Sequence, residues 1–176
     1  MAVQLLRLRL ELLRMRRRDL AMRRACLYRA KPWDQSVDRT HTQRMKVIVR
    51  RYGWPTYDMV GKRAANAAWL LVQHADHDVA WQERCLAMMR DAVSAGQATP
   101  KFFAMLTDRV RVNRGKRQEY GSQWWVHQGV FGPRPIHDRR RLNARRRAVG
   151  LPSFAVYERE MWKLYQRVHP TIRART

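Results

Sequence analysis

The segment from Ala64 to Ala75 constrains the fold more than any other part of the chain, because a helix over these residues is apolar on nearly every side. A helix without a polar face has to be buried, and its alanines allow neighbouring helices to approach closely. Polar residues begin abruptly at its far end, with Gln73 and His74. The segment therefore predicts a central helix that other helices surround.

The rest of the chain supplies those neighbours. Apolar residues at helical spacing, with Pro, Gly and capping residues between them, predict further helices over 3–29, 36–52, 79–95, 100–112, 138–149 and 153–168. No repeat and no strand pattern is found, and 117–135 is predicted to be a long loop whose aromatic side chains pack. The expected fold is all-α: one compact domain over 1–170, a bundle of about six to seven helices, with a loose tail at 171–176.

Positive charge is the strongest compositional feature. The 176 residues hold 37 Lys+Arg against 14 Asp+Glu, a net charge of +23, and 31 of the basic residues are arginine. The charge is concentrated in the basic helix 3–29 and the basic segment 134–147. Such a surface repels itself unless an anion lies nearby, which favours an acidic macromolecule, either nucleic acid or an acidic peptide, as partner. Coding bias toward arginine is the alternative. The candidate surface comprises Arg16, Arg17, Arg18, Arg139, Arg140, Arg141, Arg145, Arg146 and Arg147.

The basic helix 3–29 has three interpretations. It imitates a mitochondrial transit peptide and a membrane-surface helix, and it also fits a core-packing helix with a basic outer face. The last is favoured, because the pattern continues beyond presequence size and Asp19 interrupts the positive face. No apolar run approaches the roughly 18 residues of a membrane span. Cys26 and Cys85 form no disulfide framework and are expected as buried thiols in a reducing, cytoplasmic compartment.

The first candidate for chemistry is the polar segment 73–78. His74 shares a helix face with His77 and Asp78. A metal there would need a third ligand such as His41 or Asp108, and the spacing is weaker than His-Glu-x-x-His, so no metal or cofactor is expected. Acid/base work by His74, oriented by a carboxylate, is favoured over metal binding. A structural role, in which a buried His74 ties the helix end to a loop, remains open.

Two further candidates follow later in the chain. Asp108 and Arg109 are predicted near the end of a helix, where they suit either a polar ligand or an internal salt bridge. The segment 118–123 places Tyr120 and Gln123 around Gly121, which allows a ligand close to the backbone. A packed Ω-like loop is the alternative for this segment.

The ordered set Tyr52-Gly53-Trp54-Pro55, Val60-Gly61, Ala68 to Asp76, Leu106 to Val110 and Gln118 to Gln123 resembles a bacterial all-helical domain of unknown function, the six-six-two-four family, over roughly residues 5 to 165. The resemblance implies a helical fold and suggests that the three clusters meet in one place, with Asp38 and Arg39 as a further family position. The chain departs from the family at His41, where Asn is expected, and at Arg16-Arg17-Arg18. The basic surface is therefore expected to belong to this member.

The leading hypothesis is a polar pocket that binds, and transforms by acid/base chemistry, a small or peptide-like substrate, while the arginine-rich surface recruits an acidic partner. Two alternatives remain open. One is nucleic-acid binding without catalysis, with Trp124 or Trp125 stacking on bases, and the other is an adaptor for an acidic protein or peptide. The predicted catalytic residues are His74, Asp76 and Tyr120, and the predicted ligand-binding residues are Asp38, His41, Gln73, Asp108, Arg109 and Gln123.

Overall fold

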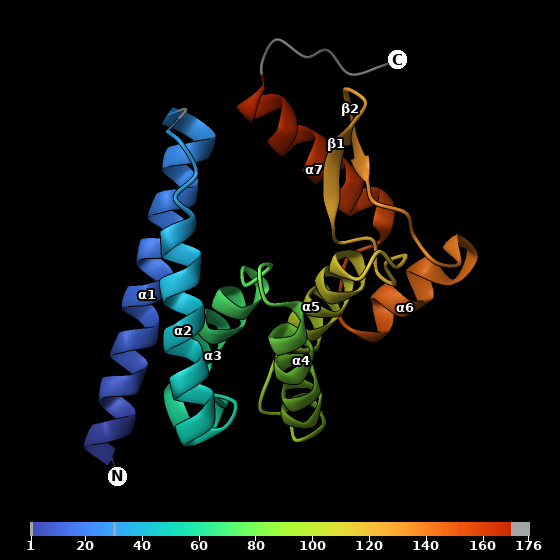
Figure 1. Cartoon of the computed structure of the whole chain (residues 1–176). Helices are drawn as coiled ribbons and strands as arrows, with labels where there is room; N and C mark the ends of the chain where they lie inside the picture. Colours follow the sequence, from blue (N-terminus) through green and yellow to red (C-terminus); the bar gives the residue numbers. More distant parts are fainter. Residues whose placement is uncertain (1, 30, 170–176) are drawn as a thin grey trace. The chain divides into compact units, whose positions relative to one another are not determined.

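The computed structural model describes residues 2–29 and 31–169, and within these ranges the predicted all-α class is confirmed (Figure 1). The tail predicted at 171–176 lies outside the described residues. Contacts divide the chain into two compact units, Met1–Leu106 and Thr107–Thr176, called the N-terminal and C-terminal units below. The single domain over 1–170 stays a prediction. The elements are α1 Ala2–Arg29, α2 Gln35–Tyr52, α3 Tyr57–Gln73, α4 Val79–Ser94, α5 Pro100–Asn113, β1 Trp124–His127, β2 Val130–Pro133, the 3₁₀ turn η1 Arg139–Arg141, α6 Leu142–Ala148 and α7 Phe154–Val168.

The N-terminal unit is built on α3. Ala64, Ala67 and Ala68 are completely buried, and α1, α2 and α4 all contact this helix. Figure 1 shows α1 and α2 running side by side along it. The prediction of a buried, alanine-rich central helix is thereby confirmed, since only side chains this small allow several helix axes to come so near.

Helix α1 packs through one face. Leu8 and Leu12 are buried, while Arg16, Arg17 and Arg18 are exposed. This arrangement agrees with the interpretation of residues 3–29 as a core-packing helix with a basic outer face. None of the helices within 2–29 and 31–169 combines the length and the apolar character that a membrane crossing requires.

Helix boundaries follow the predicted caps. Gly53, at a φ of 72°, ends α2 and donates its N–H to the carbonyl of Val49. Asp78 begins α4, where its carboxylate accepts the N–H of Trp81 at 3.0 Å. These caps set the lengths of α2 and α4 and therefore the position of the segment between α3 and α4.

Helix α3 contains a break at Gly61, where φ is 76° and ψ is 157°. The connection between α4 and α5 holds the turn before the break. The N–H of Tyr57 donates to the backbone carbonyl of Gln97, and the N–H of Asp58 donates to the side-chain oxygen of Gln97 at 3.0 Å. Gln97 Nε2 in turn donates to the Asp58 carboxylate at 2.8 Å. The residues before Gly61 thus form a short helical turn that is anchored to the connection between α4 and α5.

The C-terminal unit contains the only two strands among the described residues. β1 and β2 pair antiparallel, with Trp124 opposite Pro133 and His127 opposite Val130. The two turn residues, Gln128 and Gly129, both have positive φ, which matches the right-handed twist of a hairpin. The sequence analysis predicted a loop here and missed the hairpin, because its strands are short and Gly132 and Pro133 interrupt the alternation.

Aromatic packing joins this hairpin to α7, as predicted for the segment 117–135. Phe131 stacks on Tyr165 with ring centroids 4.0 Å apart, and Trp124 packs against Phe154 and Tyr157 at 6.2 and 6.3 Å. Such ring pairs stabilise beyond the area they bury. The core of this unit is therefore aromatic, in contrast to the alanine-based core of the other.

Gly121→Ala is expected to destabilise the C-terminal unit, because a Cβ at this position would lie 2.7 Å from Cε2 of Phe154 and φ is 69°. Backbone strain accounts for about 1–2 kcal/mol and the clash for about 1–3 kcal/mol more. Gly115→Ala is the matched control, since its φ is also 69° and no atom lies within 4 Å of the added Cβ. Chemical denaturation measures both; equal losses would show that the contact with Phe154 is unimportant.

Candidate functional site

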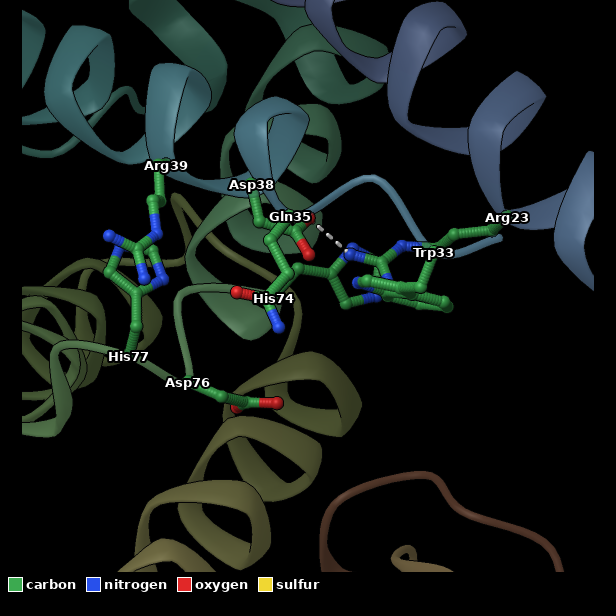
Figure 2. A pocket seen from close by; sticks show the side chains of 8 residues that line it. All are labelled: Arg23, Trp33, Gln35, Asp38, Arg39, His74, Asp76 and His77. Carbon is green, nitrogen blue, oxygen red and sulfur yellow. Dashed lines mark hydrogen bonds and ion pairs between the residues drawn. The ribbon is translucent and has the colours of Figure 1, made fainter. Parts of the chain in front are cut away.

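A polar pocket of about 410 Å³ lies in the N-terminal unit, where the end of α3 meets α1 and the start of α2. Three predicted site residues line it, namely Asp38, His74 and Asp76 (Figure 2). The complete lining is Arg23, Trp33, Gln35, Asp38, Arg39, His74, Asp76 and His77.

The imidazole of His74 is oriented by a buried carboxylate. Nδ1 of His74 lies 2.9 Å from Oδ1 of Asp19, whose side chain is 1% exposed. With Nδ1 bound to an acceptor, the proton of the neutral ring resides on Nδ1 and Nε2 carries the lone pair. His74 lines the pocket, so this arrangement equips it to accept a proton there. A carboxylate, a histidine and an open ring nitrogen in this order are the usual elements of a general base.

Arg23 connects the buried carboxylate to a second one. Its Nε donates to both oxygens of Asp19 at 3.2 Å, and its Nη2 donates to Asp38 at 2.6 Å, the bond dashed in Figure 2. Burial by itself raises the pKa of Asp19, but its hydrogen bond with His74 and the charges of His74 and Arg23 outweigh burial and hold that pKa below the usual value. Asp19 is therefore a charged group at neutral pH.

Local interactions at the end of α3 hold His74 in place. Its N–H donates to the Leu70 carbonyl at 3.2 Å as the last residue of the helical ladder. Nε2 of Gln82, a fully buried residue of α4, donates to the carbonyl of Val72 at 3.0 Å and to the Asp76 carboxylate at 3.3 Å. Carbonyls at a helix end have no partner inside the helix, so Gln82 stabilises the turn that carries the pocket residues.

Two other predicted ligand-binding residues of this unit are buried and do not line the pocket. His41 is 5% exposed, and burial lowers the pKa of its imidazole against the opposing charge of Asp19. Its Nδ1 has no hydrogen-bond partner among the described residues. Gln73 is 6% exposed, and its backbone carbonyl accepts a hydrogen bond from Nε2 of Gln82 at 3.4 Å. Both residues belong to the surroundings of the Asp19–His74 pair.

Asp108 organises a loop of the C-terminal unit. Its fully buried carboxylate accepts four donors: the N–H groups of Glu119, Tyr120 and Ser122, at 2.6 to 3.0 Å, and the Ser122 hydroxyl at 2.9 Å. Burial raises the pKa of Asp108, and these hydrogen bonds act in the opposite direction. The arrangement supports the alternative that 118–123 is a packed loop.

The remaining predicted residues also lie in the C-terminal unit. The N–H of Tyr120 donates to Asp108, and the carbonyl of Tyr120 accepts a hydrogen bond from Arg146. The backbone of Gln123 is bonded to the side chain of Gln118: the Gln123 N–H donates to Oε1 at 2.8 Å, and Nε2 donates to the Gln123 carbonyl at 3.0 Å. Arg109 is a half-buried residue of α5. That these residues share one pocket with His74 stays a prediction.

The candidate basic surface contains two kinds of arginine. Arg16, Arg17, Arg18, Arg139, Arg140, Arg141 and Arg147 are exposed. Arg145 instead donates to the carbonyls of Glu119 and His137 at 2.8 and 2.6 Å, and Arg146, 1% exposed, donates to the carbonyl of Pro152 at 2.7 Å. Arg145 and Arg146 therefore tie α6 to the loop before β1 and to the segments on either side of α6.

Among residues 2–29 and 31–169, one set of side chains has the geometry to hold a metal ion. Asp19, Asp38 and His74 offer ligand atoms that lie within 4.8 Å of one another. The guanidinium of Arg23 already binds both carboxylates, so a cation would have to displace it. Asp78, the residue considered with His74 and His77 for a metal, is bound to Lys46 at 2.6 Å and to the N-terminus of α4.

The two cysteines are free thiols with different surroundings. Cys85 is buried, and burial raises the pKa of its thiol to about 12. Cys26 is half-buried on α1, 3.5 Å from the Pro32 carbonyl. A thiol with so high a pKa is a poor nucleophile, and neither cysteine lines the pocket around His74.

Four residues of the site were not predicted from the sequence: Asp19 as the partner of His74, and Arg23, Trp33 and Gln35 in the pocket lining. A signal for Asp19 was present, since it lies seven residues after Leu12 on the face that packs inward, where an acid must have a partner. Arg23 and Trp33 carried no distinguishing pattern in a chain so rich in arginine. The guanidinium of Arg23 lies 4.6 Å from the Trp33 ring centroid.

Asp19→Asn is expected to lower the free energy of unfolding at pH 7 by about 2–4 kcal/mol, because it breaks buried charged bonds to His74 and Arg23. Since the folded-state pKa of Asp19 lies below its unfolded value, its contribution is complete above about pH 5 and is lost as the pH falls through the folded pKa. The stabilities of wild type and variant should therefore begin to converge as the pH falls below the usual aspartate pKa of about 3.9 and should meet below the folded pKa of Asp19. Denaturant titrations across pH measure this, with exposed Asp91→Asn as control. Parallel acid limbs in all three proteins would contradict the assignment.

Comparison with known proteins gives one match. The model of a family of unknown function, DUF6624, matches residues 7–167. No curated protein and no solved structure matches the chain. The match spans α1 to α7 almost completely and includes the segments that form the pocket. The chain belongs to the DUF6624 family.

Proposed function

We propose that the pocket of the N-terminal unit binds a small or peptide-like molecule bearing an anionic group, and that His74 removes a proton from it. The observation that carries the proposal is the 2.9 Å contact between Nδ1 of His74 and the buried carboxylate of Asp19. This contact leaves Nε2 as the basic atom of a residue that lines a pocket. Asp19 would then stabilise the imidazolium that forms when Nε2 takes up the proton.

The charges around the pocket support an anionic group on the substrate. Arg23 is already neutralised by Asp19 and Asp38. Arg39 lines the same pocket, is exposed, and has no ion pair among the residues that the structure describes. A guanidinium suits a carboxylate or phosphate through two parallel hydrogen bonds. Arg39 is therefore the group proposed to hold the anion, while Trp33, which is 48% exposed, lines the pocket on the side of Arg23 (Figure 2).

His74→Gln is expected to reduce turnover by about 10²- to 10⁴-fold, the usual contribution of a general base, with a smaller loss of unfolding free energy than Asp19→Asn, because Arg23 remains paired with Asp19. Turnover is measured on panels of carboxylate-bearing esters, amides and phosphoesters. His137→Gln, an exposed histidine of the C-terminal unit, is the control. Wild-type turnover in His74→Gln would overturn the catalytic role, and loss of fold would show that the residue is structural.

Binding and proton position can be tested apart from turnover. Nitrogen-15 NMR of the imidazoles is expected to find neutral His74 protonated at Nδ1. Small carboxylates and phosphates should shift its Nε2 signal in wild type and not in Arg39→Gln, while Arg51→Gln, at the far end of α2, leaves the shift intact. A proton on Nε2, or equal shifts with Arg39→Gln, would contradict the arrangement.

Nucleic-acid binding by the C-terminal unit is the second candidate. It is favoured by Arg139, Arg140 and Arg141, three consecutive arginines that are all exposed, and by exposed Arg147. Trp124 packs among aromatic rings, which leaves Trp125 as the candidate ring for stacking; it lies 4.6 Å from the His127 ring and 4.3 Å from the Arg134 guanidinium. Phosphates would bind the exposed arginines without base-specific contacts.

Arg140→Glu combined with Arg147→Glu is expected to abolish this binding and to flatten its salt dependence, because each phosphate contact releases counterions. Anisotropy of a labelled single-stranded DNA across salt concentrations measures it. Arg51→Glu with Arg90→Glu makes the same change in net charge on the N-terminal unit and serves as control. If the DNA affinity of both double variants depended equally on salt concentration, the binding would lie elsewhere on the protein or would follow from net charge alone.

A further inference from the structure

Helix α1 has a second apolar face that no described part of the chain covers. Its inner face is buried through Leu8 and Leu12. Leu6 and Leu10, on the outer face, are 54% and 44% exposed, and Val3 is 64% exposed. Residues 3, 6, 10 and 13 follow the alternating three- and four-residue spacing of a contact seam between helices. The spacing therefore indicates that α1 has two packing faces, of which the outer one is not covered by any described residue.

This outer face is hollowed into a groove of about 520 Å³. Leu10, Leu13 and Leu20 give it an apolar floor. An adjoining hollow of about 350 Å³ shares Leu20, Arg16 and Arg63 with it and adds Trp69 and Phe102. From Leu10 to Leu20 the floor extends about 15 Å along α1. The occupant is therefore elongated and has an apolar side.

The edges of the groove are strongly positive. Five arginines line it, namely Arg14, Arg16, Arg17, Arg24 and Arg63, and no carboxylate does. None of the five has an ion pair among the described residues, because the acids of α1 are engaged elsewhere: Glu11 binds Arg44 at 2.5 Å, and Asp19 binds Arg23. Five uncompensated cations around an apolar floor call for an occupant that is negative at its edges.

The shape and lining separate the kinds of anionic partner. A single nucleic-acid strand stacks its bases on open aromatic faces, whereas the floor is leucine and Trp69 and Phe102 stack on each other at 4.0 Å. A lipid surface accepts protruding apolar groups, whereas Leu13 and Leu20 are half-buried and lie within a hollow. A helix with apolar residues three and four positions apart and acids on both flanks matches the floor and the edges together.

We infer that the groove along the outer face of α1 is a docking site for an acidic amphipathic helix of a partner protein. Its apolar residues lie on Leu10, Leu13 and Leu20, and its carboxylates pair with the arginines at the edges. The site is separate from the pocket around His74, so the two can be tested independently.

The test uses the full chain and two labelled peptides of about 15 residues. One carries leucines on a single helix face flanked by glutamates, and the other has the same composition with the leucines distributed around the helix. Anisotropy is expected to give a Kd at least about tenfold lower for the patterned peptide, the effect of roughly 1.4 kcal/mol. Arg17→Glu combined with Arg24→Glu should raise that Kd by about tenfold or more, and Arg51→Glu with Arg90→Glu, of equal charge change, should leave it within about twofold.

Three results overturn the inference. Equal affinity for the two peptides means that charge alone is recognised. Equal weakening in both double variants means that the groove is not the site. Absence of patterned-peptide binding, or tighter binding of single-stranded DNA or phosphatidylserine vesicles that depends on Arg17 and Arg24, means that the occupant is not an acidic helix. Circular dichroism confirms that each variant retains its helices.

Discussion

The buried carboxylate of Asp19 is the interaction on which the N-terminal unit depends. It lies on the inward face of α1, binds the imidazole at the end of α3, and binds Arg23, which in turn binds Asp38 of α2. A charge without water is costly unless it is paired and hydrogen-bonded. The three helices therefore have to meet at this point, and the same requirement that fixes their packing also orients His74 in a pocket.

A second buried carboxylate, that of Asp108, organises hydrogen bonds in the C-terminal unit but has a different structural role. Asp108 receives four donors from one short loop and so specifies backbone conformation. Asp19 binds Arg23 of its own helix and His74 at the end of α3, and Arg23 links it to Asp38 of α2. It therefore specifies how these helices pack and how a titratable ring is oriented. Two carboxylates that look alike in sequence thus serve local structure in one case and candidate chemistry in the other. The partners determine which role applies.

Much of the helical architecture was accessible from sequence, because it depends on local signals. The apolar character of Ala64 to Ala75, the cap at Asp78 and the stop at Gly53 each act within a few residues. The hairpin at 124–133 was missed, since its strands are too short for alternation to be recognised. His74 was identified as a candidate base with a carboxylate partner, but Asp19, fifty-five positions away, could not be chosen without knowing which face of α1 meets α3.

The break in α3 has a consequence for the pocket at the other end of that helix. The turn before Gly61 is bonded to Gln97 and Thr99, so it belongs mechanically to the connection between α4 and α5. Because the hydrogen-bond ladder is interrupted at Gly61, fraying of this turn stops there and does not travel along the longer arm. The position of the His74 imidazole is therefore not disturbed when the first turn of α3 unfolds locally.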